Sequence, residues 1–351
     1  MESACTNLPT VFAGVPEFDP AGFDEDAFES RLAWIFGSPR CGSSWLMRLL
    51  CFPLEPTTRT PAGMIWRRRR ELRRRLRHPR LAMRPRAVAI NEPYLPQHLT
   101  PMVHMRFDPA DPSARALLTL NDTRVDDPHY FFSEQYADVW RPLLRRLILA
   151  RLAAQAQSAR SDAQIEDPIV IVKEPNGSYG AEYTMSLLPR ARLIFLVRDG
   201  RDVIDSLIDG MSKGGWLDQR YMRNMATAAD RLAFAKTEAR AWLERTKVVE
   251  RAFEAHPPEL RWKLRYEDLR ADTLATLRPL VDWLGIEWSD AELEAIVSEN
   301  AFEAIPARRK GSGTPIRAAT PGLWREHMSE DERQAMEEIM GSKLVELGYD
   351  V

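Results

Sequence analysis

The chain has 351 residues, a hydrophobic content of 44% and a formal net charge of −2. A chain of this size can bury a large core, in one α/β domain or in two smaller ones, and we expect one. The near-neutral charge argues against a protein that binds nucleic acids or membrane surfaces in general. A membrane span needs about eighteen consecutive apolar residues, and no run in the sequence approaches that length. Any binding of an anion must therefore be local.

The number and spacing of the cysteines also limit the class of protein. Cys5, Cys41 and Cys51 are odd in number and lack the spacing of metal ligands. The first 32 residues contain no basic stretch followed by an apolar one, which a secretory signal requires. We therefore expect reduced thiols, no metal site and a cytoplasmic location.

In chain order, residues 1–30 come first; they are rich in proline, glycine and acidic residues without a period. This composition predicts a loosely ordered leader ahead of one domain over residues 31–351. Short apolar runs followed by polar or turn residues predict strands. These runs are Ala33–Phe36, Ile169–Val172, Leu193–Val197 and Trp262–Tyr266.

Helical patterns alternate with these runs. One predicted helix follows Ser43, and the others cover about Glu134–Gln157, Asp202–Asp209, Asn224–Ala255, Leu274–Leu284, Asp290–Asn300 and Glu330–Leu347. Strands that alternate with helices predict a three-layer α/β domain, in which a mainly parallel sheet carries helices on both faces.

The segment 65–86 carries a dense run of arginines with Glu71 as its only acidic residue. Ile65, Leu72 and Leu76 fall near one helical face, so one interpretation is a solvated amphipathic helix inserted in the domain. A second interpretation is an element that steers anions or binds the acceptor. Nucleic-acid binding comes third, because few aromatic residues interrupt the run.

The stretch IFGSPRCGSSWL, residues 35–46, has the layout of a phosphate-binding turn between a strand and a helix. Gly37 and Gly42 have P-loop spacing, but Ser43 stands at the position of the P-loop lysine. In nucleotide kinases that lysine and Mg²⁺ neutralise densely charged phosphates. A ligand with one charge at its transferred end needs less positive charge from the loop. Main-chain amides at the helix N-terminus and one cation, Arg40, could hold such a ligand.

A second cluster, LIFLVRDGRDVIDSL, covers residues 193–207. Arg198 ends an apolar strand, and Ser206 lies eight residues later in the following helix. Both side chains can therefore converge on one anion above the sheet edge. The alternative is that Arg198 and Asp199 form an ion pair at the strand end.

Both clusters resemble motifs of the sulfotransferases that use 3′-phosphoadenosine 5′-phosphosulfate (PAPS). SPRCGSSW resembles the family's 5′-phosphosulfate loop, and LVRDGRDVIDS resembles its 3′-phosphate motif. Three later stretches resemble further family segments in the same order: LRYEDL at 264–269, NAFEAI at 300–305 and GLWREHMS at 322–329. The resemblance covers roughly residues 34–328 and implies a P-loop-type fold with PAPS as co-substrate.

The resemblance implies which residues hold PAPS. The 5′-phosphosulfate would be held by Arg40 and the amides of Cys41, Gly42, Ser43 and Ser44. The 3′-phosphate would be bound by Arg198 and Ser206. The adenosine pocket would be formed by Trp45, Tyr266 and Phe302. Read in isolation, Trp45 and Phe302 are also compatible with core aromatics.

The family's C-terminal phosphate loop has the pattern R-x-G-x-x-G-x-W. Here RAATPGLW keeps Arg317, Gly322 and Trp324, but Ala319 replaces the first glycine. The resemblance therefore implies Arg317 and Gly322 as further cofactor-binding residues.

Sulfuryl transfer needs an in-line acceptor oxygen, a base and cations where charge builds on the leaving phosphate, but it needs no metal. Lys173, in IVKEPNGS just past a buried strand, resembles the family lysine that steadies the bridging oxygen. The implied catalytic cations are thus Lys173 and Arg40.

Cytosolic members of the family place a histidine shortly after that lysine, and this sequence has none there. The base is then a carboxylate, as in the tyrosylprotein branch of the family. Glu92 and Glu174 are the two candidates, and the choice between them stays open. His98 and His104 are the next options, although each is more often a structural or surface histidine.

The acceptor is hardly encoded in a motif. Seven aromatic residues between Tyr94 and Trp140 could wall a pocket for a phenol, a lipid alcohol or a sugar ring, and could equally form core. We expect sulfuryl transfer to a hydroxyl or amine of a small-molecule, lipid or carbohydrate acceptor. The rivals are an ATP-dependent P-loop kinase, which Ser43 disfavours, and a non-catalytic scaffold that binds adenosine bisphosphate.

Overall fold

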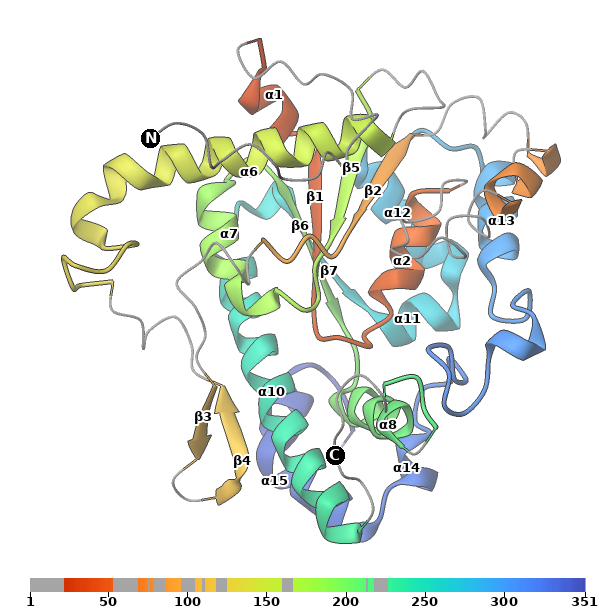
Figure 1. The fold of residues 1–351 in the computed structure, drawn as a ribbon. Helices are drawn as coiled ribbons and strands as arrows, with labels where there is room; N and C mark the ends of the chain where they lie inside the picture. The colour runs from red at the N-terminus through yellow and green to blue at the C-terminus, as the bar shows by residue number, and fades with distance from the viewer. Residues whose placement is uncertain are drawn as a thin grey trace, which may run out of the picture.

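Five parallel strands form the central sheet of the computed structural model (Figure 1). They are β1 Leu32–Phe36, β2 Ala87–Asn91, β5 Ile169–Lys173, β6 Arg192–Val197 and β7 Arg261–Arg265. Their order is β2-β5-β1-β6-β7, so β1 lies at the centre of the sheet. The predicted α/β fold with a parallel sheet is confirmed.

The structure describes residues 22–52, 69–74, 76–78, 86–95, 105–108, 111–117, 125–159, 167–212, 214–217 and 227–350. A second, antiparallel sheet pairs β3 Met105–Asp108 with β4 Asp111–Leu117. This hairpin lies beside the long helix α10, Ala228–Ala255, and away from the central sheet (Figure 1).

The four predicted strands are present, each within one residue at either end. The prediction for the last strand was wrong at its C-terminus: β7 ends at Arg265, because Tyr266 opens helix α11. Strand β2 was not predicted. Two of its five residues are alanine, which is depleted in strands, and so its sequence carries little strand signal.

The remaining helices are α1 Glu25–Glu29, α2 Ser43–Leu50, α6 Ala137–Ala159, α7 Ala181–Leu187, α8 Gly200–Met211, α11 Tyr266–Ala271, α12 Thr273–Leu284, α13 Asp290–Asn300, α14 Trp324–His327 and α15 Glu330–Glu346. Each predicted helix is found, although 134–136 form a 3₁₀ turn before α6. Predicted helical residues 224–226 lie outside the described residues. The short helices α1, α7, α11 and α14 were not predicted.

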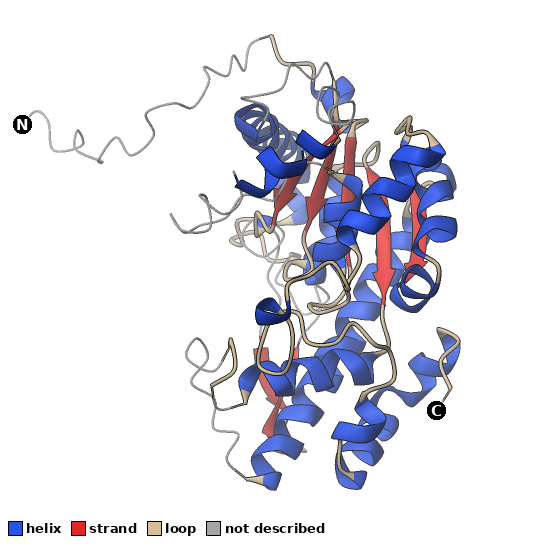
Figure 2. Ribbon diagram, turned by 90° about the vertical axis from the view of Figure 1, so that its right-hand side faces the viewer, coloured by secondary structure: helices blue, strands red, loops and turns tan. Residues whose placement is uncertain are grey.

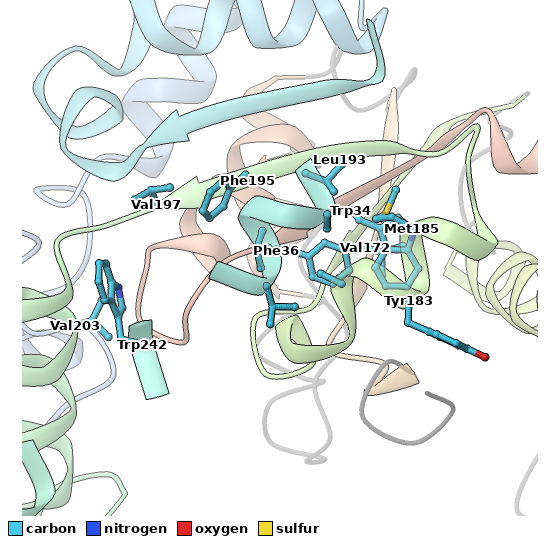
Figure 3. Close-up of a cluster of buried hydrophobic side chains, with 14 of the residues drawn as sticks. Trp34, Phe36, Val172, Tyr183, Met185, Leu193, Phe195, Val197, Val203 and Trp242 are labelled. Carbon is cyan, nitrogen blue, oxygen red and sulfur yellow. The ribbon is translucent and has the colours of Figure 1, made fainter. Parts of the chain in front are cut away.

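Helices cover both faces of the central sheet (Figure 2). Trp34 and Phe36 of β1 stack on each other at 5.4 Å between ring centroids and face α7 and α10. Tyr183 and Trp242 from those helices belong to the same cluster (Figure 3). Alternate residues of β1 join the opposite cluster with α2 and α12. Because both faces are buried, LAWIF is apolar throughout.

The packed part of the chain begins before residue 31, where we expected the leader to end. Helix α1 lies against α6, with Phe28 in the core. Arg145 of α6 donates hydrogen bonds to Glu25 at 2.8 Å and to Asp26 at 2.7 Å, and it also pairs with buried Glu29. The expected leader is therefore shorter at its C-terminal end, and residues 1–21 lie outside the described residues.

The arginine-rich segment is helical where it is described, at residues 69–74 and 76–77. Its orientation differs from the expected amphipathic helix. Leu72 and Leu76 are 58% and 74% exposed, whereas Arg74 is 1% exposed. The inward face therefore carries two charged residues, Glu71 at 8% exposed and Arg74, and not the leucines.

We expect Gly42→Ala to lower the free energy of unfolding more than Gly285→Ala does. Both glycines have left-handed backbones, with φ of 95° and 72°, so each alanine is strained by about 1–2 kcal/mol. Only at Gly42 would the new Cβ also lie 2.5 Å from Cδ2 of Tyr266, whereas Gly285 has open space. Urea denaturation measures both variants. Equal losses would contradict the close packing of this turn on Tyr266.

Candidate active site

A cleft of about 910 Å³, its open mouth included, lies beyond the carboxyl ends of β1 and β6. Separate stretches singled out from the sequence come together in its lining. The sequence-predicted residues that line it are Arg40, Gly42, Ser43, Ser44, Trp45, Arg198, Ser206, Tyr266, Phe302 and Arg317.

Five sequence-predicted site residues do not line this cleft. Three are the catalytic candidates Glu92, Lys173 and Glu174, and the other two are Cys41 and Gly322. Cys41 is fully buried in the core beneath α2, where burial raises the pKa of its thiol, and its N–H donates to the Ser38 carbonyl at 3.2 Å. Gly322 lies at a neighbouring hollow, and its N–H donates to Asp202 Oδ2 at 2.8 Å. From the sequence, a small residue such as Cys41 or Gly322 that only fills a tight turn could not be distinguished from one that contacts a ligand.

Arg40 stands at the centre of the positive charge in the cleft. Its Nε donates to Ser206 Oγ at 3.1 Å, and its Nη2 donates to the Pro315 carbonyl at 2.5 Å. Burial, followed by the charges of Arg198 and Arg317, lowers the pKa of Arg40 to about 10. Arg40 therefore shares one region with two further guanidinium groups, whose charges disfavour its own.

Arg198 and Arg317 are held in different ways. The Arg198 guanidinium lies 4.4 Å from the centroid of the Tyr266 ring, and its Nη1 donates to the Arg40 carbonyl at 2.9 Å. Its Nε is buried and has no hydrogen-bond partner among the described residues. Arg317 pairs with Asp205 of α8. The alternative that Arg198 pairs with Asp199 is not observed, because Asp199 binds Arg201 at 2.8 Å.

Aromatic rings form another wall of the cleft. Trp45, at the start of α2, meets Tyr266 edge to face with 6.0 Å between centroids. The Trp45 indole N–H donates to the main-chain carbonyl of Asn300 at 3.0 Å. Phe302 lies just beyond Asn300 and carries the ammonium of Lys310 at 4.5 Å over its ring. Such a wall suits a flat, partly polar ring system.

Ala319 has a backbone shape that usually belongs to glycine. Its φ is 56°, in the left-handed region that favours glycine. Its carbonyl accepts hydrogen bonds from Tyr266 Oη at 3.3 Å and from Arg270 Nε at 3.1 Å. The loss of the first glycine in RAATPGLW is thus compatible with a loop that still closes over the cleft.

Lys173 ends β5 next to the phosphate-type loop and is 2% exposed. Its ammonium lies 2.5 Å from Glu92 Oε1 and 3.2 Å from Ser44 Oγ. The Glu92 N–H donates to the Lys173 carbonyl at 2.8 Å, which continues the β2–β5 ladder. The Glu92 side chain is about a quarter exposed and accepts from Tyr94 Oη at 3.1 Å. This arrangement places a cation and a carboxylate side by side near α2.

Glu174, one residue later, is in a different environment. It is fully buried, and its two carboxylate oxygens accept main-chain hydrogen bonds, from Tyr94 at 2.5 Å and from Gly177 at 3.1 Å. Burial raises the pKa of Glu174 to about 7, although the two amides act to lower it. The carboxylate joins the turn after β2 to the turn after β5. Its hydrogen bonds indicate a positioning role.

Some residues of the site were missed in the sequence. Tyr94 contacts both glutamates, and Asn300 and Arg270 line the cleft. Asn300 opens the NAFEAI stretch, which was the only signal that pointed to it. His98 and His104 lie outside the described residues.

Part of the aromatic segment between Tyr94 and Trp140 is core. Trp140 stacks on Tyr183 at 5.7 Å, and Phe132 meets Trp140 edge to face at 5.5 Å. Phe131 is 78% exposed. The sequence left core and acceptor pocket equally open for these aromatic residues. The structure shows that Phe132 and Trp140 pack with the core.

In the part of the chain that the structure describes, no three histidine, cysteine or carboxylate side chains are grouped as a metal site. None of its helices combines the length and apolar character that crossing a bilayer requires.

Comparisons with known proteins place the chain. Residues 33–290 match the model of a family described as the sulfotransferase family. Solved structures similar to the chain include mouse sulfotransferase SULT7A1 complexed with PAP, at 12% identity over 90% of this chain and 85% of that one, with a TM-score of 0.46. Sulfotransferase STF9 from Mycobacterium avium follows at 15% identity, 92% and 78% coverage and a TM-score of 0.45. No curated protein matches the chain.

The buried Glu174 predicts a pH dependence of stability. Between its ordinary pKa of 4.5 and about 7, the native carboxyl binds more protons than the unfolded one, so the free energy of unfolding falls as pH rises. Glutamine does not titrate. We therefore expect stability of the parent to fall relative to Glu174→Gln by up to about 3 kcal/mol across this window.

Urea denaturation of both proteins from acid to neutral pH measures this difference. Glu337→Gln is the matched control, because Glu337 is exposed on α15 and this variant should follow the parent throughout. A constant difference between Glu174→Gln and the parent would contradict the buried, raised-pKa carboxyl.

Proposed function

The chain belongs to the sulfotransferase family, a PAPS-dependent class of transferases, and we propose that it moves the sulfuryl group of PAPS in line to a hydroxyl or amine. The proposed acceptor is a small molecule, a lipid or a carbohydrate. One observation carries the proposal: Arg40, Arg198 and Arg317 converge on a single cleft at the N-terminus of α2.

The residues present fit a ligand with two separated anionic groups and a flat base. Arg40 is desolvated beside two like charges, and Arg198 Nε has no partner within the described residues. Phosphate oxygens would relieve the repulsion and satisfy that donor, since charge-assisted hydrogen bonds to phosphate are strong. Trp45, Tyr266 and Phe302 offer aromatic surface for adenine.

We assign the two anionic ends of PAPS to the two sides of the cleft. Arg40 and the first amides of α2, at Gly42, Ser43 and Ser44, would hold the 5′-phosphosulfate, because a helix N-terminus favours anions. Arg198, Ser206 and Arg317 would bind the 3′-phosphate. Cys41 and Gly322 would contribute through the backbone shape of their loops.

Lys173 would stabilise the leaving phosphate. PAPS, when bound, supplies the activated sulfuryl group and its phosphate leaving group. The Lys173 ammonium already contacts Ser44 at the start of α2, next to the proposed 5′ site. Drawing this ammonium toward the leaving oxygen would weaken its contact with Glu92, which lies 2.5 Å away in this structure. Cations placed where charge develops are the main source of such catalysis.

Glu92 is our proposed general base. During transfer the acceptor oxygen forms a bond to sulfur, the bond from sulfur to the phosphate oxygen breaks, and the acceptor proton must leave. Glu92 Oε1 would take that proton as Lys173 shifts toward the phosphate. The partial exposure of Glu92 leaves it reachable, whereas both oxygens of buried Glu174 are engaged by main-chain amides.

Two rival functions make different predictions for ligand binding. An ATP-dependent kinase would need Mg²⁺, and Ser43 at the lysine position argues against it. A non-catalytic scaffold would bind adenosine 3′,5′-bisphosphate (PAP) without turnover, and the Lys173–Glu92 pair argues against a purely binding role. Calorimetry with PAP in the absence of Mg²⁺, followed by assays with labelled PAPS and an acceptor library, tests the proposal. Absence of PAP binding would overturn it.

We expect Arg198→Ala to lower the affinity for PAP by about ten- to a hundred-fold while barely changing the affinity for AMP. The reason is that Arg198 would contact only the 3′-phosphate, which AMP lacks. Ser206→Ala should show the same selectivity with a smaller loss.

Calorimetry with both nucleotides measures the effect. Arg190→Ala is the charge control, because Arg190 precedes β6 at its other end and is exposed. Equal losses for PAP and AMP would show that Arg198 acts through folding or general charge.

For the base, we expect Glu92→Gln to lower the single-turnover rate by about 10²–10⁴-fold with PAP binding nearly intact. The acidic limb of its pH–rate profile should also disappear. Single-turnover conditions are required, because only they report the chemical step.

Glu174→Gln is the comparison variant. We expect it to depress the rate through Tyr94 and Gly177 while the acidic limb remains. If instead Glu174→Gln removes the limb and Glu92→Gln keeps it, the two roles are reversed.

A further inference from the structure

Arg74 is an unusual residue of the arginine-rich segment because its side chain is buried. It is 1% exposed, while Leu72 and Leu76 on the same helical stretch face solvent. A helix that turns an arginine inward and leucines outward gives up apolar burial. Contacts specific to the arginine must offset that loss, since buried charges are retained only where they are well paired.

The contacts of Arg74 join the ends of two helices. Its Nη2 donates to Asn300 Oδ1 at 2.9 Å, and Asn300 is the last residue of α13. Its guanidinium lies 4.8 Å from the ring centroid of Phe52, which is buried just past the end of α2. Arg74 therefore bridges the C-terminal ends of α2 and α13.

Neighbouring contacts fix the segment in the same place. Arg77 pairs with Glu299 at 2.9 Å, one residue before Asn300. The His78 ring meets Phe52 edge to face at 5.7 Å. Three residues of the segment thus engage the same two helix ends, so that the helical stretch is docked there and not merely solvated.

Asn300 links this contact to the proposed adenine site. It is buried and its Nδ2 donates to the Ile296 carbonyl at 2.8 Å, which leaves Oδ1 for Arg74. Its main-chain carbonyl accepts from the Trp45 indole N–H at 3.0 Å. Both Asn300 and Trp45 line the cleft. The path from Arg74 to the aromatic wall is therefore two hydrogen bonds long.

We propose that Arg74 is a positioning residue for the adenine of the co-substrate. It fixes Asn300, and Asn300 in turn fixes the orientation of the Trp45 ring. This inference rests on the proposed function, because it takes the cleft to be the PAPS site. It assigns a role in adenine recognition to a segment whose arginines otherwise suggest general anion binding.

General anion steering predicts a different pattern of effects. Exposed arginines on the segment, such as Arg73, would raise association rates for any anion, with or without a base. Arg74 is buried and is linked to the cleft through Asn300 and Trp45. Its loss should therefore affect ligands that carry adenine and spare those that do not.

The test compares PAP with ribose 3,5-bisphosphate, which keeps both phosphates and lacks the base. We expect Arg74→Met, which retains a side chain to pack on Phe52, to weaken PAP binding by about five- to thirtyfold. This is less than the loss of a direct charge-assisted hydrogen bond to the ligand, because Arg74 acts through Asn300. The affinity for ribose 3,5-bisphosphate should change by less than about twofold, and Arg74→Lys should recover part of the PAP affinity. Calorimetry and melting temperatures are measured for each protein.

Arg73→Met is the matched control, since it removes the same charge from an exposed position of the same helical stretch. It should leave both affinities within about twofold of the parent. Unchanged PAP binding in Arg74→Met, or equal weakening of both ligands, would overturn the positioning role. A parent chain that fails to bind PAP would overturn the proposed function itself, which is a separate result.

A double-mutant cycle covers the case in which Arg74→Met folds poorly. Asn300→Ala removes the acceptor of the Arg74 hydrogen bond while keeping the main-chain carbonyl that holds Trp45. If Arg74 acts through Asn300, adding Arg74→Lys to Asn300→Ala should cause no further loss of PAP affinity beyond about twofold. Independent, multiplying losses would overturn the proposal.

Discussion

Repulsion among three half-buried guanidinium groups is the constraint around which the cleft is built. Arg40 is desolvated beside Arg198 and Arg317, and its pKa falls to about 10. The protein holds these charges together with modest partners: the hydroxyl of Ser206, the carboxylate of Asp205 and the face of Tyr266. Positive charge that is only partly compensated, here by Asp205, stores free energy in the free protein. That free energy becomes available for binding when an anion enters, which is why the cleft suits a ligand with more than one phosphate-like group.

The backbone around the cleft is adapted to the same end. Arg40, Gly42 and Ala319 all have left-handed φ values, of 70°, 95° and 56°. Such conformations are unfavourable for residues with side chains and persist where surrounding contacts impose them. Here Tyr266 supplies much of that support, since its ring packs on Gly42 and its hydroxyl donates to the Ala319 carbonyl. One tyrosine thus connects the loop after β1 to the loop before α14 and sets the width of the cleft between them.

The strands and the cleft were predictable from sequence for a physical reason. Strands buried on both faces must be apolar throughout, and LAWIF and LIFLV carry that signal over a short span. Charged residues that follow such strands lie at one edge of the sheet. The sequence alone therefore predicts that Arg40 and Arg198 lie at the same edge. By contrast, β2 follows a charged segment in the sequence and contains two alanines, so its strand signal is weak. The inward turn of Arg74 was also hidden, because periodicity assigns leucines to the inside and cannot anticipate the amide acceptor supplied by Asn300, more than two hundred residues away.

Our proposal of Glu92 as the base also depended on structure, because the two stretches that contain Glu92 and Glu174 say nothing about how their carboxylates are hydrogen-bonded. Glu92 and Glu174 lie at the ends of neighbouring strands and both contact Tyr94, yet they meet different surroundings. Main-chain amides that point at both oxygens of Glu174 tie it to the fold, whereas Glu92 has a cation on one oxygen and a phenol on the other. A lysine can leave a carboxylate for a phosphate within one side-chain rotation, but a main-chain amide cannot move without unfolding a turn. The carboxylate with the movable partner is therefore the one suited to exchange a proton during turnover, and the immobile one is suited to keep Tyr94 in place beside it.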